Sequence, residues 1–390
     1  MIALLTLGLY PSSGGPAKSV RAFRDALGAD VISWVDPDER AREPLVWDRS
    51  LEIAGSRLPV LKQLQVPLPG ATAEAERLIA RARLVSVHSF WRWHVAWVHR
   101  ICRRHGVPYW YVPHGSLDPY VIQGRDAVQK RLFMTVAGRA FLRDAATVVY
   151  ATSGERDKAR PLVGHDRAEL IHWPLSSEDL RSRDASARAA MRAQLGIPED
   201  AVCFLYLGRL SPMKRPVETI TAFARAGLAD AHLIVVGNDF GVTADDCRAA
   251  AAARGVAGRV HVTGPLYGPA KRAVLDAADV YLSLSHRENF NFTAAEALAA
   301  GLPLILSPGN DLARDLRGLA GVCRLADDAP STAAAAMQAM AARGPRALAR
   351  LGADGAVWAA THLDAARFAR TLSDAASRHA RRDPALSPPS

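Results

Sequence analysis

The chain has 390 residues, a net charge of +10, 49% hydrophobic residues and 23% charged residues. This length allows two domains of ordinary size, and the composition is that of a globular protein and excludes a fibrous or disordered one. No stretch approaches the roughly 20 apolar residues of a membrane-spanning helix, and the four cysteines lack metal-ligand spacing, which favours reduced thiols in a cytoplasmic protein.

In the first half, short apolar runs alternate with helical stretches, as is typical of parallel α/β sheets. The run 2–9 predicts a first strand and not a secretory leader, because no basic segment precedes it and turn residues follow. The helix predicted at 92–105 carries Val95, Val98 and Ile101, together with Cys102, on one face. The expected strands are 2–9, 31–34, 84–87, 109–112 and 147–150, and the expected helices include 18–27, 73–83 and 92–105.

Two loops in this half are candidates for binding. Gly14 and Gly15 follow the first strand, and glycines there let the backbone approach a phosphate or a sugar, although a plain turn explains them equally well. His114 follows the strand 109–112 in the segment Pro-His-Gly-Ser-Leu-Asp-Pro. At the carboxyl edge of a sheet, a histidine can bind a hydroxyl or carry a proton, with a structural histidine as the alternative. Glu155 is expected to cap the helix after the strand 147–150.

A break between domains is predicted at 175–200, which is polar, rich in arginine and without a strand. We predict a first domain at 1–180 and a second at 186–358, the second opening with a helix at 186–195. A last helix is expected at 364–380, followed by a proline-rich tail at 381–390 that we expect to be disordered. The strands expected in the second half are 203–208, 232–236, 259–263, 280–284 and 302–306.

Two cations follow the first strand of the second half. Arg209 and Lys214 lie in the loop between that strand and a helix that starts near Pro216. Cations at this edge can neutralise a diphosphate without a metal ion. Taken alone, Arg209 and Lys214 would more often be two surface cations near a helix start.

The most informative stretch is 285–303, where two glutamates lie eight positions apart. Glu288 follows a strand, and Glu296 lies inside a short helix that Gly301 and Pro303 end. Such a loop offers a carboxylate for hydroxyls, helix-start amides for a phosphate and a second carboxylate for a ribose. For an isolated glutamate pair, a solvated helix cap would be the alternative. The residues expected to start the helix are Asn289, Phe290, Asn291, Phe292 and Thr293.

These motifs resemble a known family. Ser-x-x-Glu-x-Phe followed by Glu-Ala-Leu-Ala-Ala-Gly-x-Pro resembles the nucleotide-sugar loop of family 4 retaining glycosyltransferases of the GT-B fold. Gly-Arg-Leu-x-x-x-Lys at 208–214 resembles the cationic loop of that family, and the segment around His114 resembles its bacterial polysaccharide members. Arg215 and Asn291 stand where the family has glycine.

The resemblance implies two Rossmann-like domains with a cleft between them, and C-terminal helices at 359–380 that pack back on the first domain. It implies retaining, metal-independent transfer of a hexose, without a cofactor, from a nucleotide diphosphate sugar to a saccharide. That acceptor would be lipid-linked, in cell-surface polysaccharide biosynthesis at the inner membrane face. The implied catalytic residues are His114, Glu288, Arg209 and Lys214. The implied donor-binding residues are Gly14, Gly15, Arg209, Lys214, Asn289, Phe290, Asn291, Phe292, Thr293 and Glu296.

Other functions stay open at this point. A nucleotide-sugar epimerase or a phosphorylase shares the architecture, and the net charge also fits a nonenzymatic anion-binding protein. Nucleic acid is not an expected partner, because no helix-turn-helix, zinc-finger or aromatic RNA-binding pattern occurs. An anionic membrane surface is a further expected partner, although each basic cluster also fits a solvated face. Those clusters are 100–105, 130–131, 139–143 and 378–382.

Overall fold

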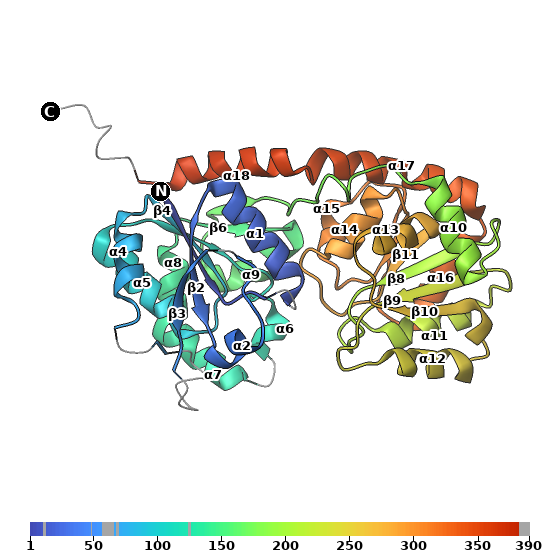
Figure 1. The fold of residues 1–390 in the computed structure, drawn as a ribbon, viewed down its shortest axis with the longest axis horizontal. Helices are drawn as coiled ribbons and strands as arrows, with labels where there is room; N and C mark the ends of the chain where they lie inside the picture. The colour runs from blue at the N-terminus through green and yellow to red at the C-terminus, as the bar shows by residue number, and fades with distance from the viewer. Residues whose placement is uncertain (11–12, 48, 57–65, 68–69, 124–125, 382–390) are drawn as a thin grey trace. The chain divides into compact units, whose positions relative to one another are not determined.

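The computed structural model describes residues 1–10, 13–47, 49–56, 66–67, 70–123 and 126–381 (Figure 1). The chain divides into two compact units: Met1–Pro174 with Ala366–Ser390 form unit 1, and Leu175–Ala365 form unit 2. Unit 2 thus begins at Leu175, the first residue of the predicted linker, and the chain returns to unit 1 at Ala366. Beyond Arg381, the tail predicted to be disordered lies outside the described residues. Within the described ranges, no helix combines the length and the apolar character needed to cross a membrane.

Unit 1 is built on a seven-stranded parallel sheet with the order β3-β2-β1-β4-β5-β6-β7. The chain order reverses between β1 and β4, and the carboxyl ends of such neighbouring strands form the crevice where open α/β sheets bind ligands. The strands are β1 (Ile2–Leu7), β2 (Asp30–Val35), β3 (Leu51–Ala54), β4 (Leu84–His88), β5 (Tyr109–Val112), β6 (Thr147–Tyr150) and β7 (Ala168–Leu170).

Helices cover both faces of this sheet (Figure 1). On one face α4 packs on α5, and α5 and α9 pack on α8, while α1 lies on the other face, where Phe23 meets Phe368 of α18. The predicted apolar face of α5 is confirmed, because Val95, Val98 and Ile101 are buried with Cys102. The helices are α1 (Gly15–Leu27), α2 (Pro37–Arg42), α4 (Ala73–Arg81), α5 (Trp93–His105), α6 (Pro119–Gln123), α7 (Ala127–Phe133), η2 (Met134–Gly138), α8 (Arg139–Asp144), α9 (Ser153–Val163) and α18 (Ala365–His379).

Unit 2 repeats the architecture with a six-stranded parallel sheet in the order β10-β9-β8-β11-β12-β13, which reverses between β8 and β11. Its strands are β8 (Cys203–Leu207), β9 (His232–Val236), β10 (Val260–Gly264), β11 (Val280–Ser283), β12 (Leu304–Leu306) and β13 (Val322–Arg324). Its helices are α10 (Ala185–Leu195), α11 (Pro216–Ala226), α12 (Ala244–Ala253), η3 (Ala257–Arg259), α13 (Gly268–Ala277), α14 (Phe292–Ala299), α15 (Leu312–Asp315), α16 (Pro330–Ala341) and α17 (Gly344–His362).

The predicted fold class of two Rossmann-like α/β domains is confirmed. Sequence patterns found the central strands of both sheets but missed β3, β7 and β13. These are short edge strands whose residues are mostly partly exposed. An edge strand needs no continuous apolar run, so it leaves little signal in the sequence.

Candidate functional site

The predicted donor residues of unit 2 gather at its topological switch point. Arg209 and Lys214 lie between β8 and α11, and Glu288 lies between β11 and α14. Since β8 and β11 are the two strands between which the order reverses, their loops leave the sheet side by side. The local sequence builds this arrangement, because β8 and β11 are fully buried apolar strands that end in polar loops.

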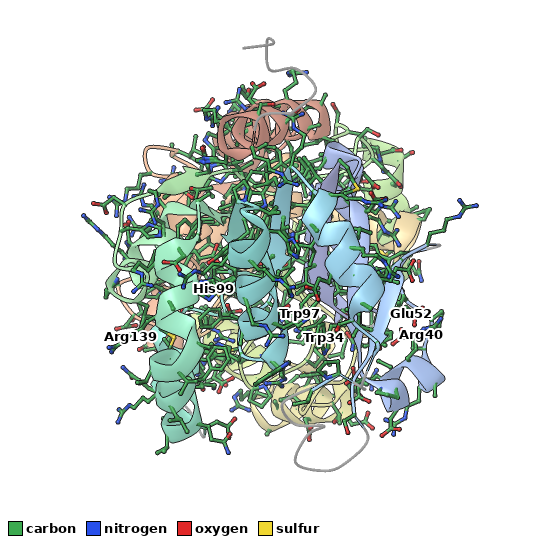
Figure 2. All side chains as sticks on the ribbon, turned by 90° about the vertical axis from the view of Figure 1, so that its left-hand side faces the viewer. Trp34, Arg40, Glu52, Trp97, His99 and Arg139 are labelled. Atoms are coloured by element: carbon green, nitrogen blue, oxygen red, sulfur yellow. The ribbon has the colours of Figure 1, made fainter. Side chains whose placement is uncertain are left out.

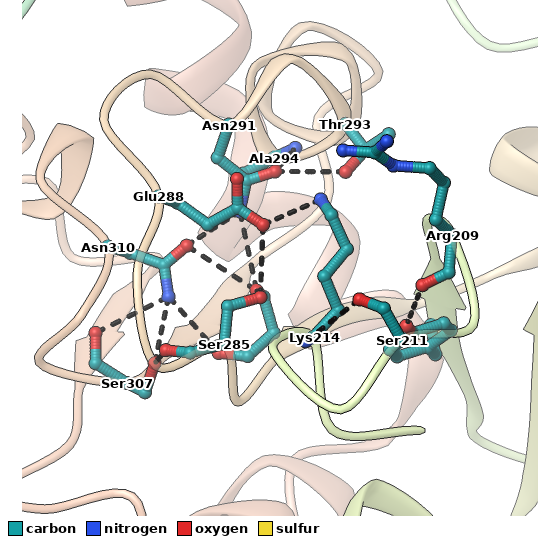
Figure 3. Close-up of polar contacts among 12 residues, drawn as sticks. Arg209, Ser211, Lys214, Ser285, Glu288, Asn291, Thr293, Ala294, Ser307 and Asn310 are labelled. Carbon is teal, nitrogen blue, oxygen red and sulfur yellow. Dashed lines mark hydrogen bonds and ion pairs between the residues drawn. The ribbon is translucent and has the colours of Figure 1, made fainter. Parts of the chain in front are cut away.

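Lys214 and Glu288 form an ion pair across these two loops (Figure 3). Nζ of Lys214 lies 2.6 Å from Oε1 of Glu288, which also accepts a 3.0 Å hydrogen bond from the Ser285 hydroxyl. The backbone of Glu288 is fixed as well, since its N–H donates to the Gly309 carbonyl and its carbonyl accepts from the Asp311 N–H, both at 2.8 Å. The fold therefore brings two of the predicted residues into direct contact and holds the glutamate by the loop after β12.

Asn291 shapes the start of α14. It is the N-cap residue with a left-handed φ of 56°, and its Oδ1 accepts a 3.3 Å hydrogen bond from the Ala294 N–H. Its Nδ2 donates to Oδ1 of Asn310 at 2.6 Å and to the Ser283 hydroxyl at 3.3 Å (Figure 3). Asparagine tolerates this backbone region and, unlike the glycine of the resembled family, it also caps the helix. No pattern in the sequence predicts this contact between Asn291 and Asn310.

The predicted start of the helix at Asn289 is wrong, because α14 begins at Phe292. The left-handed backbone of Asn291 cannot continue into a right-handed helix, so Asn289 and Phe290 belong to the preceding loop. Phe290 is buried and packs edge to face against Phe292, with ring centroids 5.0 Å apart. Of the predicted anion-binding amides, those of Phe292 and Thr293 lie in the first helical turn.

Arg215 adopts the conformation that glycine would have, with a φ of 57° at the N-cap of α11. Its Nη1 lies 2.8 Å from Oδ2 of Asp328 and donates a 2.6 Å hydrogen bond to the carbonyl of the same residue. The side chain is almost completely buried in these contacts. Its charge is thus balanced by Asp328 and does not join Lys214 as a further cation facing the loop.

Arg209 has an aromatic partner that sequence reasoning missed. Its guanidinium carbon lies 4.6 Å from the centroid of the Phe240 ring, a cation–π contact, although that ring is 57% exposed. The Arg209 carbonyl accepts a 2.8 Å hydrogen bond from the Tyr206 hydroxyl. Only the tertiary fold brings the loop after β9 against the loop after β8.

Glu296 is buried and paired. Its Oε2 lies 2.9 Å from Nζ of Lys271 on α13, and that ammonium also lies 3.6 Å from Oδ1 of Asp179. Only 1% of the Glu296 side chain is exposed. The predicted carboxylate thus carries a lysine partner that the glutamate spacing in the sequence does not reveal.

Unit 1 contains a cavity of about 270 Å³ beside its own switch point. His114 reaches it from the loop after β5 and has a left-handed φ of 49°. The carboxylate of Glu155 holds this loop, because Oε1 accepts from the Gly115 N–H at 2.6 Å and Oε2 from the Ala151 N–H at 3.0 Å. The predicted cap of α9 is supplied instead by the Thr152 hydroxyl, and Glu155 anchors the loop of His114. The cavity is lined by Thr6, Leu7, Leu9, Pro16, Val20, Ser89, Phe90, Trp91, Arg92, Pro113, His114 and Ser116.

His114 is part of a hydrogen-bonded chain. Its Nε2 lies 2.8 Å from Nδ1 of His88, whose Nε2 lies 2.9 Å from the Ser86 hydroxyl, and its Nδ1 lies 3.4 Å from the Ser19 hydroxyl. Burial lowers the pKa of His114 to about 4, and burial together with His114 lowers the pKa of His88 well below its ordinary value. Both imidazoles are therefore neutral near pH 7, each with one donor and one acceptor nitrogen.

Gly14 and Gly15 lie on the same side of unit 1 as this cavity, since Pro16 of α1 lines it. Gly14 is the N-cap of α1 with a φ of 67°, a value that glycine adopts without strain, and Gly15 is the first helical residue. Among the residues that the structure describes, no side chain caps this helix N-terminus. The predicted close approach of backbone to a ligand is compatible with this geometry.

Strained backbone concentrates in these loops. Among the described residues, four that are not glycine have a positive φ: Ser89, His114, Arg215 and Asn291. Each follows one of the central strands β4, β5, β8 or β11. Residues in sparsely populated conformations cluster at functional sites, so the strain marks the same loops that the motifs do.

Two family models match the chain. Residues 15–174 match the glycosyl transferase 4-like domain, and residues 187–321 match glycosyl transferases group 1. The first match lies within unit 1 and the second within unit 2, and together they cover more than half of the chain. A D-inositol 3-phosphate glycosyltransferase of Geodermatophilus obscurus is 34% identical over 202 residues, which are 48% of this chain and 44% of that protein. The chain spans about half the length of the curated relatives it matches.

Solved structures resemble the whole chain. Anabaena HepE in complex with UDP and glucose has a TM-score of 0.74 at 16% identity, covering 97% of this chain and 100% of HepE. The lipopolysaccharide outer core galactosyltransferase WaaB has a TM-score of 0.69 at 13% identity, covering 97% and 99%. At these identities the likeness concerns the fold, and it confirms the GT-B prediction.

Proposed function

The chain belongs to the group 1 glycosyltransferases, with a family 4-like N-terminal domain, and from this premise we propose that it is a retaining, metal-independent hexosyltransferase. It moves a sugar from a nucleotide diphosphate sugar to a hydroxyl of a lipid-linked saccharide. The observation that carries the proposal is the convergence of Lys214, Glu288 and the first turn of α14 at the switch point of unit 2.

The chemistry follows from charge. When the bond between sugar and diphosphate breaks, negative charge grows on the leaving phosphate, and preorganised cations and amides stabilise it. An ammonium has three donors, so Lys214 can keep its bond to Glu288 and still donate to a phosphate oxygen. Arg209 and the amides of Phe292 and Thr293 add to that stabilisation, while Glu288 accepts from sugar hydroxyls. Gly14 and Gly15 of unit 1 approach the diphosphate through their backbone.

His114 acts on the sugar that is transferred. Because its pKa is lowered to about 4, it is neutral at pH 7. Its Nε2 is bonded to His88, so its Nδ1 binds the sugar hydroxyl in place of the Ser19 hydroxyl, which lies 3.4 Å away. We propose that the leaving group and the acceptor use the same face of the sugar, so that the anomeric configuration is retained. NMR of the first product formed tests this, and an inverted anomer would refute it.

The donor is best tested with nucleotides first. HepE, a structural neighbour, is known in complex with UDP and glucose, so UDP-sugars head the panel. A donor that binds the folded state raises the unfolding temperature, and Glu296→Gln should reduce that rise if Glu296 binds the ribose. Donor that is converted without any acceptor would instead indicate an epimerase.

A second structural neighbour guides the choice of acceptor. WaaB, another structural neighbour, is a lipopolysaccharide outer core galactosyltransferase. We propose by analogy that this chain extends a lipid-linked saccharide in cell-surface polysaccharide biosynthesis, at the cytoplasmic face of the membrane. Transfer to a lipid-linked acceptor in the presence of EDTA would support both this acceptor class and metal independence. Loss of transfer in EDTA would refute metal independence.

A further inference from the structure

The structure separates the basic clusters of the sequence into two kinds. Four of their arginines are balanced by acidic side chains, whereas Arg100, Arg131 and Arg139 are exposed and form no ion pair with any residue that the structure describes. Arg131 and Arg139 are the two unbalanced arginines of the helical run formed by α7, η2 and α8. The balanced pairs are Arg104 with Glu76 at 3.3 Å, Arg103 with Asp144 at 3.9 Å, Arg143 with Asp144 at 2.9 Å and Arg378 with Glu169 at 2.9 Å.

The two unbalanced arginines share a helical face with exposed apolar side chains. Along the helical run of α7, η2 and α8, Val128 is 79% exposed, Leu132 65% and Val136 75%. Their spacing of four residues places them along one side of the run. We name Val128, Arg131, Leu132, Val136 and Arg139 the α7–η2 face. Such a contiguous exposed apolar row marks an interaction surface more often than chance.

The opposite side of the same helical run is packed into unit 1. Phe133 contacts Phe90 and Trp91 with ring centroids 5.4 and 5.7 Å away, and Met134 is buried. Gly138 lets the helix approach closely, because a Cβ there would lie 3.1 Å from Cζ of Phe90. Packing of the inner side therefore accounts for one set of apolar residues and leaves the α7–η2 face without a partner among the described residues. Figure 2 shows this run, with Arg139 labelled, on the side of unit 1 turned toward the viewer.

Helix α7, which carries part of the α7–η2 face, lies beside the cavity of unit 1. Nζ of Lys130, on α7, lies 5.8 Å from the Trp91 ring, and Trp91 lines the cavity together with His114. Lys130 also donates a 2.6 Å hydrogen bond to the Val121 carbonyl, which ties α7 to α6. On α6, which contacts α7, Tyr120 is 61% exposed.

We propose that the α7–η2 face docks the protein on an anionic lipid bilayer, with its apolar side chains in the interface and Arg131 and Arg139 on the lipid headgroups. Basic residues beside an apolar row are the composition of helices that lie in the membrane interface. Residues 126–139 contain three basic residues and a single acidic one, so the charge of the run complements an anionic surface. This proposal rests on the lipid-linked acceptor proposed above, which would lie in the membrane. A docking face beside the cavity would hold the enzyme at the surface where such an acceptor is found.

The test is co-sedimentation of the full chain with vesicles of phosphatidylcholine alone or mixed in equal parts with phosphatidylglycerol. Wild type should bind the mixed vesicles, and added salt should weaken the binding. Arg131→Gln with Arg139→Gln should lower partition by about 30-fold, since each basic residue near such a surface contributes about fivefold. Leu132→Ser with Val136→Ser should lower it by about tenfold or more. Two matched control variants change α17 instead. One carries Arg346→Gln with Arg350→Gln, the other carries Val357→Ser, and both should bind like wild type.

A label gives a second readout that does not depend on affinity. An environment-sensitive fluorophore attached after Leu132→Cys should shift to the blue on mixed vesicles, and the same label after Val357→Cys should not. Equal binding to both vesicle types, or equal loss in the α17 controls, would overturn the proposal. Light scattering gives a further outcome that would overturn it. If wild type is a dimer and the variant with Leu132→Ser and Val136→Ser is a monomer, the α7–η2 face joins two copies of the chain instead. None of these readouts uses donor turnover, so their failure is distinct from failure of the proposed transferase activity.

Discussion

Nδ1 of His88 lies 2.8 Å from Nε2 of His114, and the two rings stack with centroids 5.1 Å apart. Since a neutral imidazole has one donor and one acceptor nitrogen, the tautomers of the two rings are coupled: when Nδ1 of His88 donates, Nε2 of His114 accepts, and the reverse. His88 is therefore a positioning residue. It orients the histidine that lines the cavity of unit 1 and couples its own tautomer to that of His114.

This relationship predicts that His88→Leu lowers kcat by about tenfold or more while changing the KM for the donor little. His114 would keep its place but lose the hydrogen-bond partner that orients its ring. His88→Gln, which can still donate and accept, should recover part of the lost rate. Steady-state kinetics of the two variants check this, and equal loss in both would point to packing as the role of His88.

The same pair predicts a dependence of stability on pH. Burial lowers the pKa of His114 to about 4 and that of His88 well below its ordinary value, whereas in the unfolded chain both titrate near pH 6.5. Between about pH 6.5 and 4 the unfolded state therefore binds more protons. The stability that is fully present above about pH 6.5 is therefore lost as the pH falls. For each histidine, the equilibrium constant of unfolding rises by about tenfold per pH unit in this window.

Urea unfolding at several pH values between 7 and 4 measures this loss. A variant with His88→Gln and His114→Gln should lose less stability over that window than wild type. His94, whose pKa burial also lowers to about 4, remains in both proteins and gives a common background. An identical pH dependence in the two proteins would contradict the prediction.

Lys214 and Arg215 are adjacent cations for which we predict opposite results. Lys214→Ala removes the ammonium that pairs with Glu288 and should lower kcat/KM by about 100-fold or more, since electrostatic stabilisation of the leaving diphosphate is lost. Arg215→Gly removes a cation that Asp328 already balances, and glycine accepts the left-handed backbone, so activity should stay within about threefold. Assays with a fixed donor compare the two. A large loss in Arg215→Gly would show that total loop charge matters more than the Lys214 ammonium.

Asn291 should matter for stability more than its backbone conformation suggests. Asn291→Gly relieves the left-handed strain but deletes the cap on Ala294 and leaves Oδ1 of the buried Asn310 without its 2.6 Å donor. The buried Oδ1 of Asn310 would keep only the weak 3.4 Å bond from the Ser283 hydroxyl. We expect a net destabilisation of about 1–3 kcal/mol, because losing the helix cap and the strong bond to a buried acceptor costs more than the strain returns. Chemical denaturation measures it, and a more stable variant would mean that the strain dominates.

The α/β architecture and the key loops were predictable from the sequence because their signals are local. Buried central strands such as β5 and β8 are continuous apolar runs, and helices such as α5 repeat apolar residues at helical spacing. The spacing of Glu288 and Glu296 and the positions of Arg209 and Lys214 after a strand are equally local. Together they predicted the fold, the family and the unit 2 loops where the candidate residues gather.

Partners that are distant in sequence were decided by the tertiary structure alone. Nothing near Glu296 predicts Lys271, and nothing near Gly115 predicts the carboxylate of Glu155, since strand order determines which loops meet. The same holds for the basic clusters, whose arginines look alike in the sequence. Whether an arginine is balanced by an acid or left exposed beside apolar side chains depends on which helix packs next to it, and that is a property of the folded chain.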